Sequence, residues 1–495
     1  MLFHSREFLF FFLPAVYLVW LACVYSRNQR FSVLWLTFAS LLFYAYWNPS
    51  YLVLLLTSIG SNFGIGMLVD PNRKRSFHIR KWSLIFGIAA NLGLLGYAKY
   101  ANFFVDTVNQ VFSTGWTFDN VILPLAISFY TFQQIAYLID SHQGKVCEHN
   151  LLNYVFFVSF FPQLIAGPIV HHSEIYSQIN RGFSFRNISL QFFGGISIFL
   201  LGLFKKVVLA DSCGELATPV FDAPLLVAAI HSSDAWAGVL GYAFQIYFDF
   251  SGYSDMAIGL AFIFGIQLPD NFQSPYRATN IIDFWRRWHI TLSQFLKNYL
   301  YIPLGGNRKG FFIRYRNLFI TMLLGGLWHG AGWPFVIWGA LHGLYLITNH
   351  LWREFRPLKT IAVSKHLAVA FGWMLTFSSV TLAWVFFRAP DLPSALALIT
   401  HLFGNSASLP AMALSGDFIN SYLRWPFLAL LTGICLGLPT TRAYFQRLWD
   451  SSIKDVSLLS WKPNPLHGCV MGFLLFCVVR KYYTLAPTEF LYFNF

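Results

Sequence analysis

Hydrophobic residues fill most of this chain in long runs, and short polar segments separate the runs. An apolar run of about 20 residues is long enough to cross a bilayer as a helix, whereas shorter runs suit re-entrant segments. The pattern predicts an all-α polytopic membrane protein with about 11–14 membrane segments. The apolar runs lie near 8–25, 32–47, 51–69, 82–104, 121–139, 152–170, 188–204, 226–248, 254–268, 317–331, 334–350, 366–387, 424–440 and 466–480.

The organisation of the chain indicates one domain. No internal repeat and no long linker interrupts the succession of apolar runs, so we predict a single transmembrane domain over residues 1–495. The first run, 8–25, is long enough to span and lacks a small-residue cleavage site at its end. We interpret it as the first transmembrane helix rather than a signal peptide.

Composition excludes a soluble protein. Hydrophobic residues make up 56% of the chain and charged residues only 11%, whereas soluble domains carry about 25% charged residues. The six cysteines are scattered without the close spacing of a metal knuckle or a redox pair. We therefore predict no disulfide and no metal site.

The net charge of +13 is better explained by membrane topology than by nucleic-acid binding, because Lys and Arg fall in short loops between apolar runs. The 71–81 loop holds Arg73, Lys74, Arg75, Arg80 and Lys81, whereas residues 106–120 hold neither Lys nor Arg. This alternation predicts an outward N-terminus, a cytoplasmic 71–81 loop and an outward 106–120 segment.

His329 is the first candidate for catalysis. It stands in the sequence Leu327-Trp328-His329-Gly330, and no Asp, Glu, Lys or Arg occurs from 317 to 347. The Gly332-Trp333-Pro334 sequence predicts a helix break just after this histidine, with Pro334 suited to start the next helix. A neutral imidazole in such a site can take a proton from a hydroxyl. The alternative is a core histidine bonded to a backbone carbonyl freed by the break.

His289 is the second candidate, within the sequence Phe284-Trp285-Arg286-Arg287-Trp288-His289-Ile290-Thr291-Leu292-Ser293. Residues 282–302 mix aromatic and basic side chains, which predicts an amphipathic helix at the interface or in a protein cavity. In a helix, Trp285, His289 and Ser293 would share one face, and Ser293 could fix the imidazole tautomer. An interfacial histidine without a catalytic role is the alternative, and for His342 we favour a structural role.

Basic residues surround these motifs. Arg286, Arg287 and Lys297 are candidates for binding an acyl donor that carries phosphate groups, although the positive-inside rule also explains them. Asp249 and Asp255 lie in the apolar segment 247–255, where Gly252 suggests a break. Intramembrane carboxylates call for a functional hypothesis. We interpret this segment as architectural, and a proton-coupled transporter is the alternative.

Together these segments resemble the signature of membrane-bound O-acyltransferases. The similarity includes 161–168, the 247–255 segment, the 284–308 region and the Trp-His-Gly sequence at His329. It extends to a bacterial branch that modifies alginate or teichoic acid. The resemblance implies the helical fold of that family with a central tunnel, a signature core at 245–350 and His329 as the catalytic histidine. His289 would assist it or orient the substrate.

The aromatic tail at 489–495 also resembles the ending of bacterial members of this branch. The resemblance implies that Tyr492 carries the acyl group between the membrane enzyme and an extracytoplasmic partner. Relay by a side chain divides one difficult transfer into two easier steps. An interfacial aromatic anchor is the alternative.

The function implied is O-acetylation of an alginate-like exopolysaccharide by a multi-pass protein of the bacterial inner membrane. Acetyl-CoA or another cytoplasmic acyl thioester would be the donor substrate, and no cofactor would be bound. The implied partners are membrane lipids, an extracytoplasmic SGNH-type acetyltransferase and, through it, the polysaccharide acceptor, with no nucleic acid. D-alanyl transfer to teichoic acid is the alternative within the same family.

Overall fold

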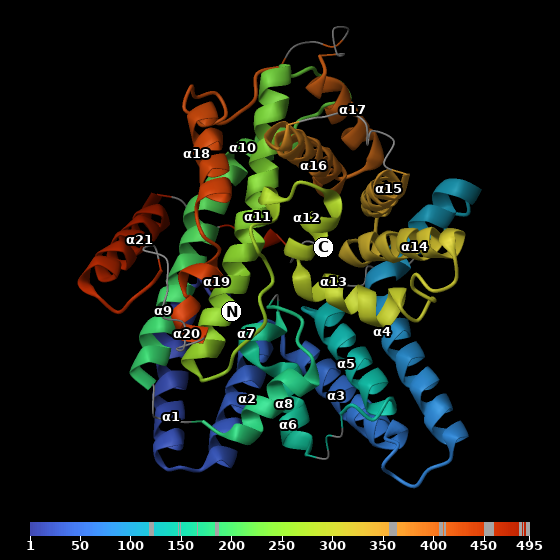
Figure 1. Cartoon of the computed structure of the whole chain (residues 1–495), viewed down its shortest axis with the longest axis vertical. Coiled ribbons are helices and arrows are strands. Elements are labelled where there is room, and N and C mark those ends of the chain that lie inside the picture. Colours follow the sequence, from blue (N-terminus) through green and yellow to red (C-terminus); the bar gives the residue numbers. More distant parts are fainter. Residues whose placement is uncertain are drawn as a thin grey trace. The chain divides into compact units, whose positions relative to one another are not determined.

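The computed structural model describes residues 1–117, 123–146, 148, 150–165, 167–183, 188–355, 364–404, 409, 412–449, 460–484, 488, 490 and 491. Every regular element among these residues is a helix, and they contain no β-strand (Figure 1). The predicted all-α class is therefore confirmed.

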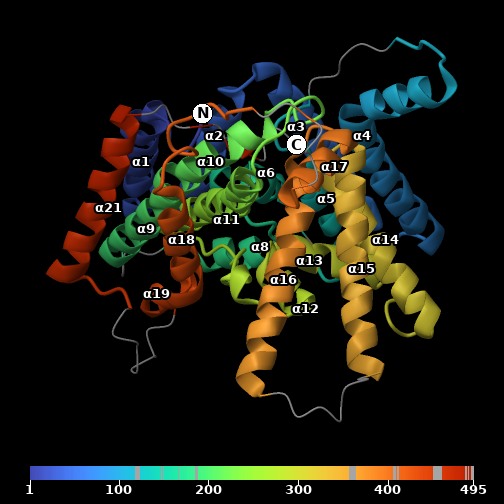
Figure 2. The same ribbon diagram turned by 90° about the horizontal axis from the view of Figure 1, so that it is seen from above.

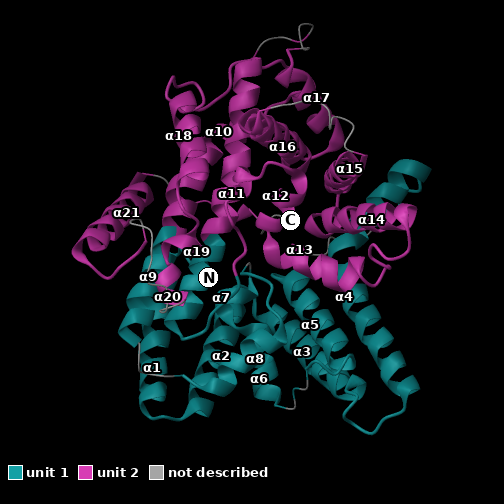
Figure 3. Ribbon diagram, viewed as in Figure 1, with its two compact units in different colours: residues 1–201, 253–269 teal, residues 202–252, 270–495 magenta. Residues whose placement is uncertain are grey.

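Two compact units make up the chain (Figure 3). Unit 1 comprises residues 1–201 and 253–269, and unit 2 comprises residues 202–252 and 270–495. The helices α9 and α11 contribute residues to both units. The division does not test whether the chain folds as one domain, so the single-domain organisation stays a prediction.

Unit 1 contains the N-terminal helices. Within it, α3, α4 and α5 pack against one another, and α3 begins with Pro49 after the N-cap Asn48, whose side chain accepts a hydrogen bond from the backbone of Ser50. The elements are η1 (Phe8–Phe12), α1 (Leu13–Tyr25), α2 (Gln29–Ala45), α3 (Pro49–Val69), α4 (Phe77–Phe112), α5 (Ile127–His142), α6 (Leu151–Ser159), α7 (Phe161–Leu164), α8 (His172–Arg181) and most of α9 (Ile188–Phe204).

The prediction of one membrane run over 152–170 is wrong. The first helix there, α6, ends at Ser159, and the short α7 starts at Phe161. Pro162 explains the interruption, because a proline inside a helix removes a backbone hydrogen bond and clashes with the carbonyl four residues earlier.

Unit 2 contains the histidine motifs. Figure 2 shows α15 and α16 side by side, and α14 packs against α15. The elements are η3 (Lys205–Ala210), α10 (Asp211–Phe221), the larger part of α11 (Ser232–Ile263), η4 (Pro275–Arg277), α12 (Ile281–Arg287), α13 (Ile290–Leu296), η5 (Lys297–Tyr301), α14 (Phe311–His329), α15 (Trp333–Phe355), α16 (Lys365–Arg388), α17 (Leu392–Leu402), α18 (Arg424–Gly437), α19 (Thr441–Tyr444), α20 (Gln446–Trp449) and α21 (Pro465–Thr484).

The break expected at Gly252 does not occur. The two runs predicted at 226–248 and 254–268 are joined in α11, which continues through Gly252. A Cβ at this position would lie 2.7 Å from the carbonyl oxygen of Gly202. The glycine therefore allows close approach of the α9 backbone rather than a change of direction.

Five helical segments among the described residues are long and apolar enough to cross a membrane. They are Phe8–Tyr25, Pro49–Val69, Phe77–Phe112, Ile188–Phe221 and Lys365–Arg388, and Leu392–Leu402 and Arg424–Gly437 are shorter apolar helices. A multi-pass membrane protein is thus confirmed. The count of about 11–14 segments, the central tunnel and the orientation of the loops stay predictions.

Candidate active site

His329 is the last residue of α14, and the break predicted after it is present. α14 ends at His329, and α15 begins at Trp333 with Pro334 as its second residue. The two helices approach closely because Gly326 faces Gly339, and a Cβ on Gly326 would lie 2.9 Å from the Cα of Gly339. This crossing brings α15 against the end of α14 and so fixes where the imidazole lies.

Aromatic rings enclose His329. Its ring centroid lies 5.1 Å from that of Trp338 on α15 and 5.2 Å from that of Phe387 on α16. Only 3% of its surface is exposed. Gly330 is needed beside it, because a Cβ there would collide with the ring of Phe335. The histidine is thus enclosed largely by aromatic side chains.

His289 lies at a chain break rather than on a helix face. α12 ends at Arg287, Trp288 is extended, and His289 itself has a φ of 41°, in the left-handed region, before α13 starts at Ile290. The predicted amphipathic helix over 282–302 is therefore interrupted. The expected face of Trp285, His289 and Ser293 is wrong for the same reason.

Asn271, not Ser293, holds the imidazole of His289. Nδ1 of His289 lies 3.0 Å from Oδ1 of Asn271, and the backbone N–H of Ile290 donates to the Asn271 carbonyl at 3.0 Å. The Ser293 hydroxyl instead donates to the Trp288 carbonyl at 3.4 Å. Asn271 precedes His289 by 18 positions in the sequence. The two side chains therefore meet only because the chain folds back between these residues.

The contacts of Asn271 fix the tautomer of His289. The backbone N–H of Thr291 points to the same Asn271 atom at 3.4 Å, and the Thr291 hydroxyl donates to it at 2.9 Å. A backbone N–H can only donate, so that atom must be the carboxamide oxygen. His289 therefore carries its proton on Nδ1, and the lone pair of Nε2 is left to accept. Nε2 has no hydrogen-bond partner within the described part of the chain.

Burial lowers the pKa of His289 to about 3. The charged imidazolium is disfavoured because the residue is fully buried and a low-dielectric surrounding penalises charge. His289 is therefore neutral across the physiological range. A base with so low a pKa is weak. It is better suited to accept a hydrogen bond from a substrate hydroxyl, and so to orient it, than to remove the proton alone.

The two candidate histidines are brought together in unit 2. Their ring centroids are 6.5 Å apart, and the ring of Phe250 from α11 lies edge to face against His289 at 4.7 Å. One small polar group could contact both imidazoles across this distance. The arrangement suits general-base removal of a hydroxyl proton with a second group that orients the same hydroxyl.

His342 belongs to the aromatic packing behind the pair. The indole N–H of Trp285 donates to its Nδ1 at 3.3 Å, and its ring lies 4.7 Å from Trp338. It is fully buried. These contacts agree with the structural role favoured for it, because the ring supports Trp338, which in turn contacts His329.

The basic candidates lie outside this core. Arg286 and Lys297 are exposed, and no ion pair joins either to a carboxylate in the residues described. Arg287 is half-buried and pairs with Asp283 at 3.0 Å, which gives it a local structural role. Arg286 and Lys297 are thus more available than Arg287 for an anionic donor.

Tyr492 lies outside the described residues, but the chain just before it is placed. The backbone N–H of Leu491 donates to Oδ2 of Asp249 at 3.1 Å. Phe490 is buried with its ring 5.9 Å from that of Phe250, the ring that also contacts His289. Phe490 is therefore separated from His289 by one aromatic side chain, that of Phe250.

The sequence analysis missed two residues whose contacts bear on the candidate site. Asn271 gave no signal, because a single asparagine outside a motif is unremarkable. Lys206 did give one, because a lysine inside an apolar run demands an explanation. It lies within the candidate span Ile188–Phe221 and ion-pairs with Asp249 at 2.7 Å.

The hydrogen bond from His289 to Asn271 allows a test of positioning. Asn271→Leu is expected to lower activity severely, as is His289→Ala, because each removes the oriented imidazole. Asn271→Asp keeps the acceptor and should restore part of the activity. Its carboxylate would raise the pKa of His289 by at least about one unit. The imidazolium would then form at higher pH, so the acid limb of the activity profile would move upward in Asn271→Asp.

Rates measured over a range of pH with matched protein levels would check this. A merely structural asparagine would give an Asn271→Asp variant with an unshifted pH profile. Full activity of Asn271→Leu would show that the carboxamide does not orient the imidazole.

Comparisons with known proteins agree with this chemistry. Residues 143–388 match the membrane-bound O-acyltransferase family. The chain is 45% identical to a peptidoglycan O-acetyltransferase of Helicobacter pylori, over 85% of this chain and 83% of that protein. It is 40% identical to a probable alginate O-acetylase of Pseudomonas aeruginosa, over 87% of this chain and 82% of that protein. A probable alginate O-acetylase of Pseudomonas putida is 38% identical over the full length of both chains.

Proposed function

Because this chain belongs to the membrane-bound O-acyltransferase family, we propose that it transfers acetyl groups from a cytoplasmic thioester to a glycan outside the inner membrane. The observation that carries the proposal is the placement of His329 beside the oriented imidazole of His289. The names of its relatives, which act on peptidoglycan or alginate, support acetyl as the group and a glycan as the final acceptor.

The proposed reaction has two steps. In the first, His329 takes the hydroxyl proton of Tyr492 as the oxygen attacks the thioester carbonyl, and the carbon–sulfur bond breaks to release the thiol with a proton. In the second, a hydroxyl of an extracytoplasmic partner attacks the tyrosyl ester, which restores the tyrosine hydroxyl, and a sugar hydroxyl then takes the acetyl group from the partner. The contact of Phe490 with Phe250, the ring that also contacts His289, supports a role for the tail in the first step.

The second step requires a protein on the outer face. We propose an SGNH-type acetyltransferase as the partner that receives the acetyl group and passes it to the polymer. The donor is acetyl-CoA or a related thioester, and the exposed Arg286 and Lys297 are suited to attract its phosphates. The proton-coupled transporter is not supported, because the ion pair with Lys206 accounts for the burial of Asp249.

The direct experiment supplies purified protein with acetyl-CoA labelled in the acetyl group, alone and with the partner and a glycan. Alginate and peptidoglycan fragments serve as separate acceptor arms. We expect label on the C-terminal peptide without the partner and on one glycan when the partner is present. If acetyl-CoA is not consumed while a D-alanyl thioester on a carrier protein is, the chain performs D-alanyl transfer instead.

A further inference from the structure

A buried lysine in unit 2 pairs with two carboxylates. Nζ of Lys206, in η3, lies 2.7 Å from Oδ1 of Asp249 on α11 and 3.0 Å from Oδ1 of Asp211 on α10. Lys206 and Asp249 are each 1% exposed and Asp211 8%. One carboxylate is enough to neutralise a buried ammonium, so the second carboxylate calls for a further explanation.

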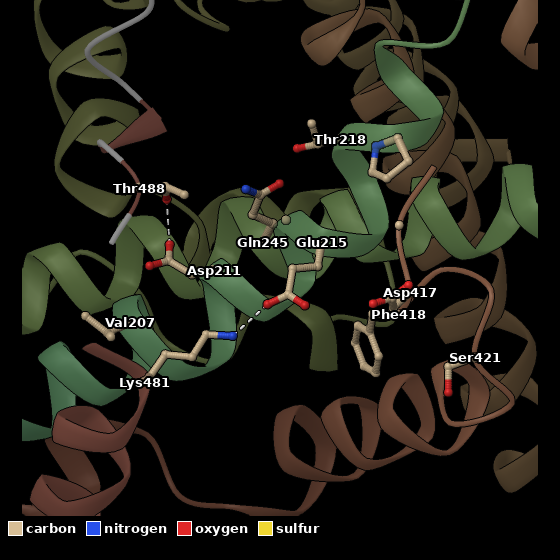
Figure 4. Close-up of a pocket in the computed structure, with 13 residues that line it drawn as sticks. Val207, Asp211, Glu215, Thr218, Gln245, Asp417, Phe418, Ser421, Lys481 and Thr488 are labelled. Carbon is tan, nitrogen blue, oxygen red and sulfur yellow. Dashed lines mark hydrogen bonds and ion pairs between the residues drawn. The ribbon is translucent and has the colours of Figure 1, made fainter. Parts of the chain in front are cut away.

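The C-terminal segment completes this cluster. The Thr488 hydroxyl accepts a hydrogen bond from Lys206 Nζ at 3.0 Å and donates to Asp211 Oδ1 at 2.6 Å, as Figure 4 shows for Asp211. Three residues later, the backbone N–H of Leu491 donates to Asp249 Oδ2 at 3.1 Å. Each of the three charged groups thus bonds to the tail, and bonds to charged groups are stronger than neutral ones.

The helix before the tail is fixed to the same part of unit 2. Lys481, near the end of α21, pairs with Glu215 at 2.6 Å and donates to the Ser212 hydroxyl at 3.0 Å, both on α10. The chain is therefore attached at Lys481, again at Thr488 and again at Leu491. These attachments restrict where the following residue can lie, because successive Cα atoms are only about 3.8 Å apart.

We propose that Lys206, Asp211 and Asp249 form a docking site for the C-terminal tail of this chain, here called the tail clasp. The clasp holds Thr488 and Leu491, and Phe490 lies against Phe250, the ring that also contacts His289. Its proposed role is to present the tail, and with it Tyr492, to this part of unit 2. Its three side chains are positioning residues, since they act through the tail and not on the acyl group. The proposal rests on the proposed function for the role of Tyr492, but the docking itself does not.

A cavity of about 650 Å³ borders the clasp. Asp211 and Thr488 are among its lining residues, together with Gln245 and Phe418 (Figure 4). Thr488 is exposed, so its hydroxyl reaches the buried charges from the cavity side. A change at this position therefore alters the tail end of the contact without opening the packed core.

Thr488→Val tests the clasp, because valine keeps the shape of threonine and removes only the hydroxyl. Thr484→Val is the matched control, because Thr484 is also exposed. Among the described residues, its hydroxyl donates only to carbonyls of its own helix. Both changes are made in full-length protein carrying Leu491→Cys. Reaction with a maleimide is then followed by mass spectrometry of the C-terminal peptide, which separates this thiol from the native cysteines.

We expect Thr488→Val to speed labelling at position 491 by about tenfold, since bonds to two charged groups are lost. Thr484→Val should stay within about twofold of the parent, and Thr488→Ser should restore slow labelling. An unchanged rate in Thr488→Val would overturn the docking site. The same variants, with Leu491 retained, are assayed for acetyl transfer to the glycan.

Transfer should fall about tenfold in Thr488→Val and recover in Thr488→Ser, in parallel with labelling. Faster labelling with undiminished transfer would overturn the positioning role. The relay hypothesis and the docking hypothesis can fail independently. Normal transfer by Tyr492→Phe would contradict the relay, but it would not affect the labelling result, which reports docking alone.

Discussion

Replacing His329 with alanine is expected to lower acetyl transfer by about 10²–10⁴-fold, the usual contribution of a positioned acid–base group. The residue ends α14 within a ring of aromatic side chains and faces the second histidine at 6.5 Å. His342, the other buried histidine of this region, accepts a hydrogen bond from the indole N–H of Trp285 and belongs to the aromatic packing. The measurement is the acetyl content of the polymer at matched expression in the membrane fraction.

His366→Ala is the matched control, because this histidine is exposed in the first turn of α16, at the opposite end of the helix from Phe387, which contacts His329. It should acetylate normally. Acetylation of the polymer at the parent level by His329→Ala would show that the histidine is a core residue. Loss of the protein from the membrane in His329→Ala alone would also favour that alternative, so the amount inserted is measured in parallel.

Replacing Tyr492 with phenylalanine is expected to reduce glycan acetylation to background. The substitution keeps the aromatic ring and removes the oxygen, so no atom remains to carry the acetyl group. A membrane anchor would tolerate the change, since phenylalanine still partitions into the interface. Labelled donor shows the effect directly, because the C-terminal peptide of Tyr492→Phe should carry no acetyl group.

Tyr483→Phe provides the control for this deletion of one atom. Tyr483 is 85% exposed at the end of α21, and its loss of a hydroxyl should leave transfer unchanged. Normal glycan acetylation in Tyr492→Phe would establish the tail as an anchor, and the acetyl group would then pass directly to another acceptor.

The two predictions together separate the base from the relay. His329→Ala should block formation of the tyrosyl ester, whereas Thr488→Val should reduce transfer through altered placement of the tail. Asn271→Leu should act through His289 without removing either the base or the relay. Each group is thus distinguished by its own measurement. Ester formation reports on His329, labelling at position 491 reports on Thr488, and the pH profile reports on Asn271.

Local sequence determined the helical membrane class and the surroundings of His329. Long apolar runs leave a helix as the satisfied form of the backbone in lipid, and most of the predicted runs coincide with helices such as α3, α9 and α16. The end of α14 at His329 also follows from neighbouring residues, because Gly330 and Pro334 act within a few positions of it. Such signals need no knowledge of the rest of the chain.

Tertiary structure decided the partners of His289 and of the tail. His289 has a left-handed backbone conformation and a hydrogen bond to Asn271. Both depend on the path of the chain between α11 and α13, which cannot be predicted from the spacing of apolar residues. Lys206 meets Thr488 across 282 positions, and no local pattern links residues so far apart. Their meeting is favoured because a buried charge must find an opposite charge and hydrogen-bond partners wherever the fold places them.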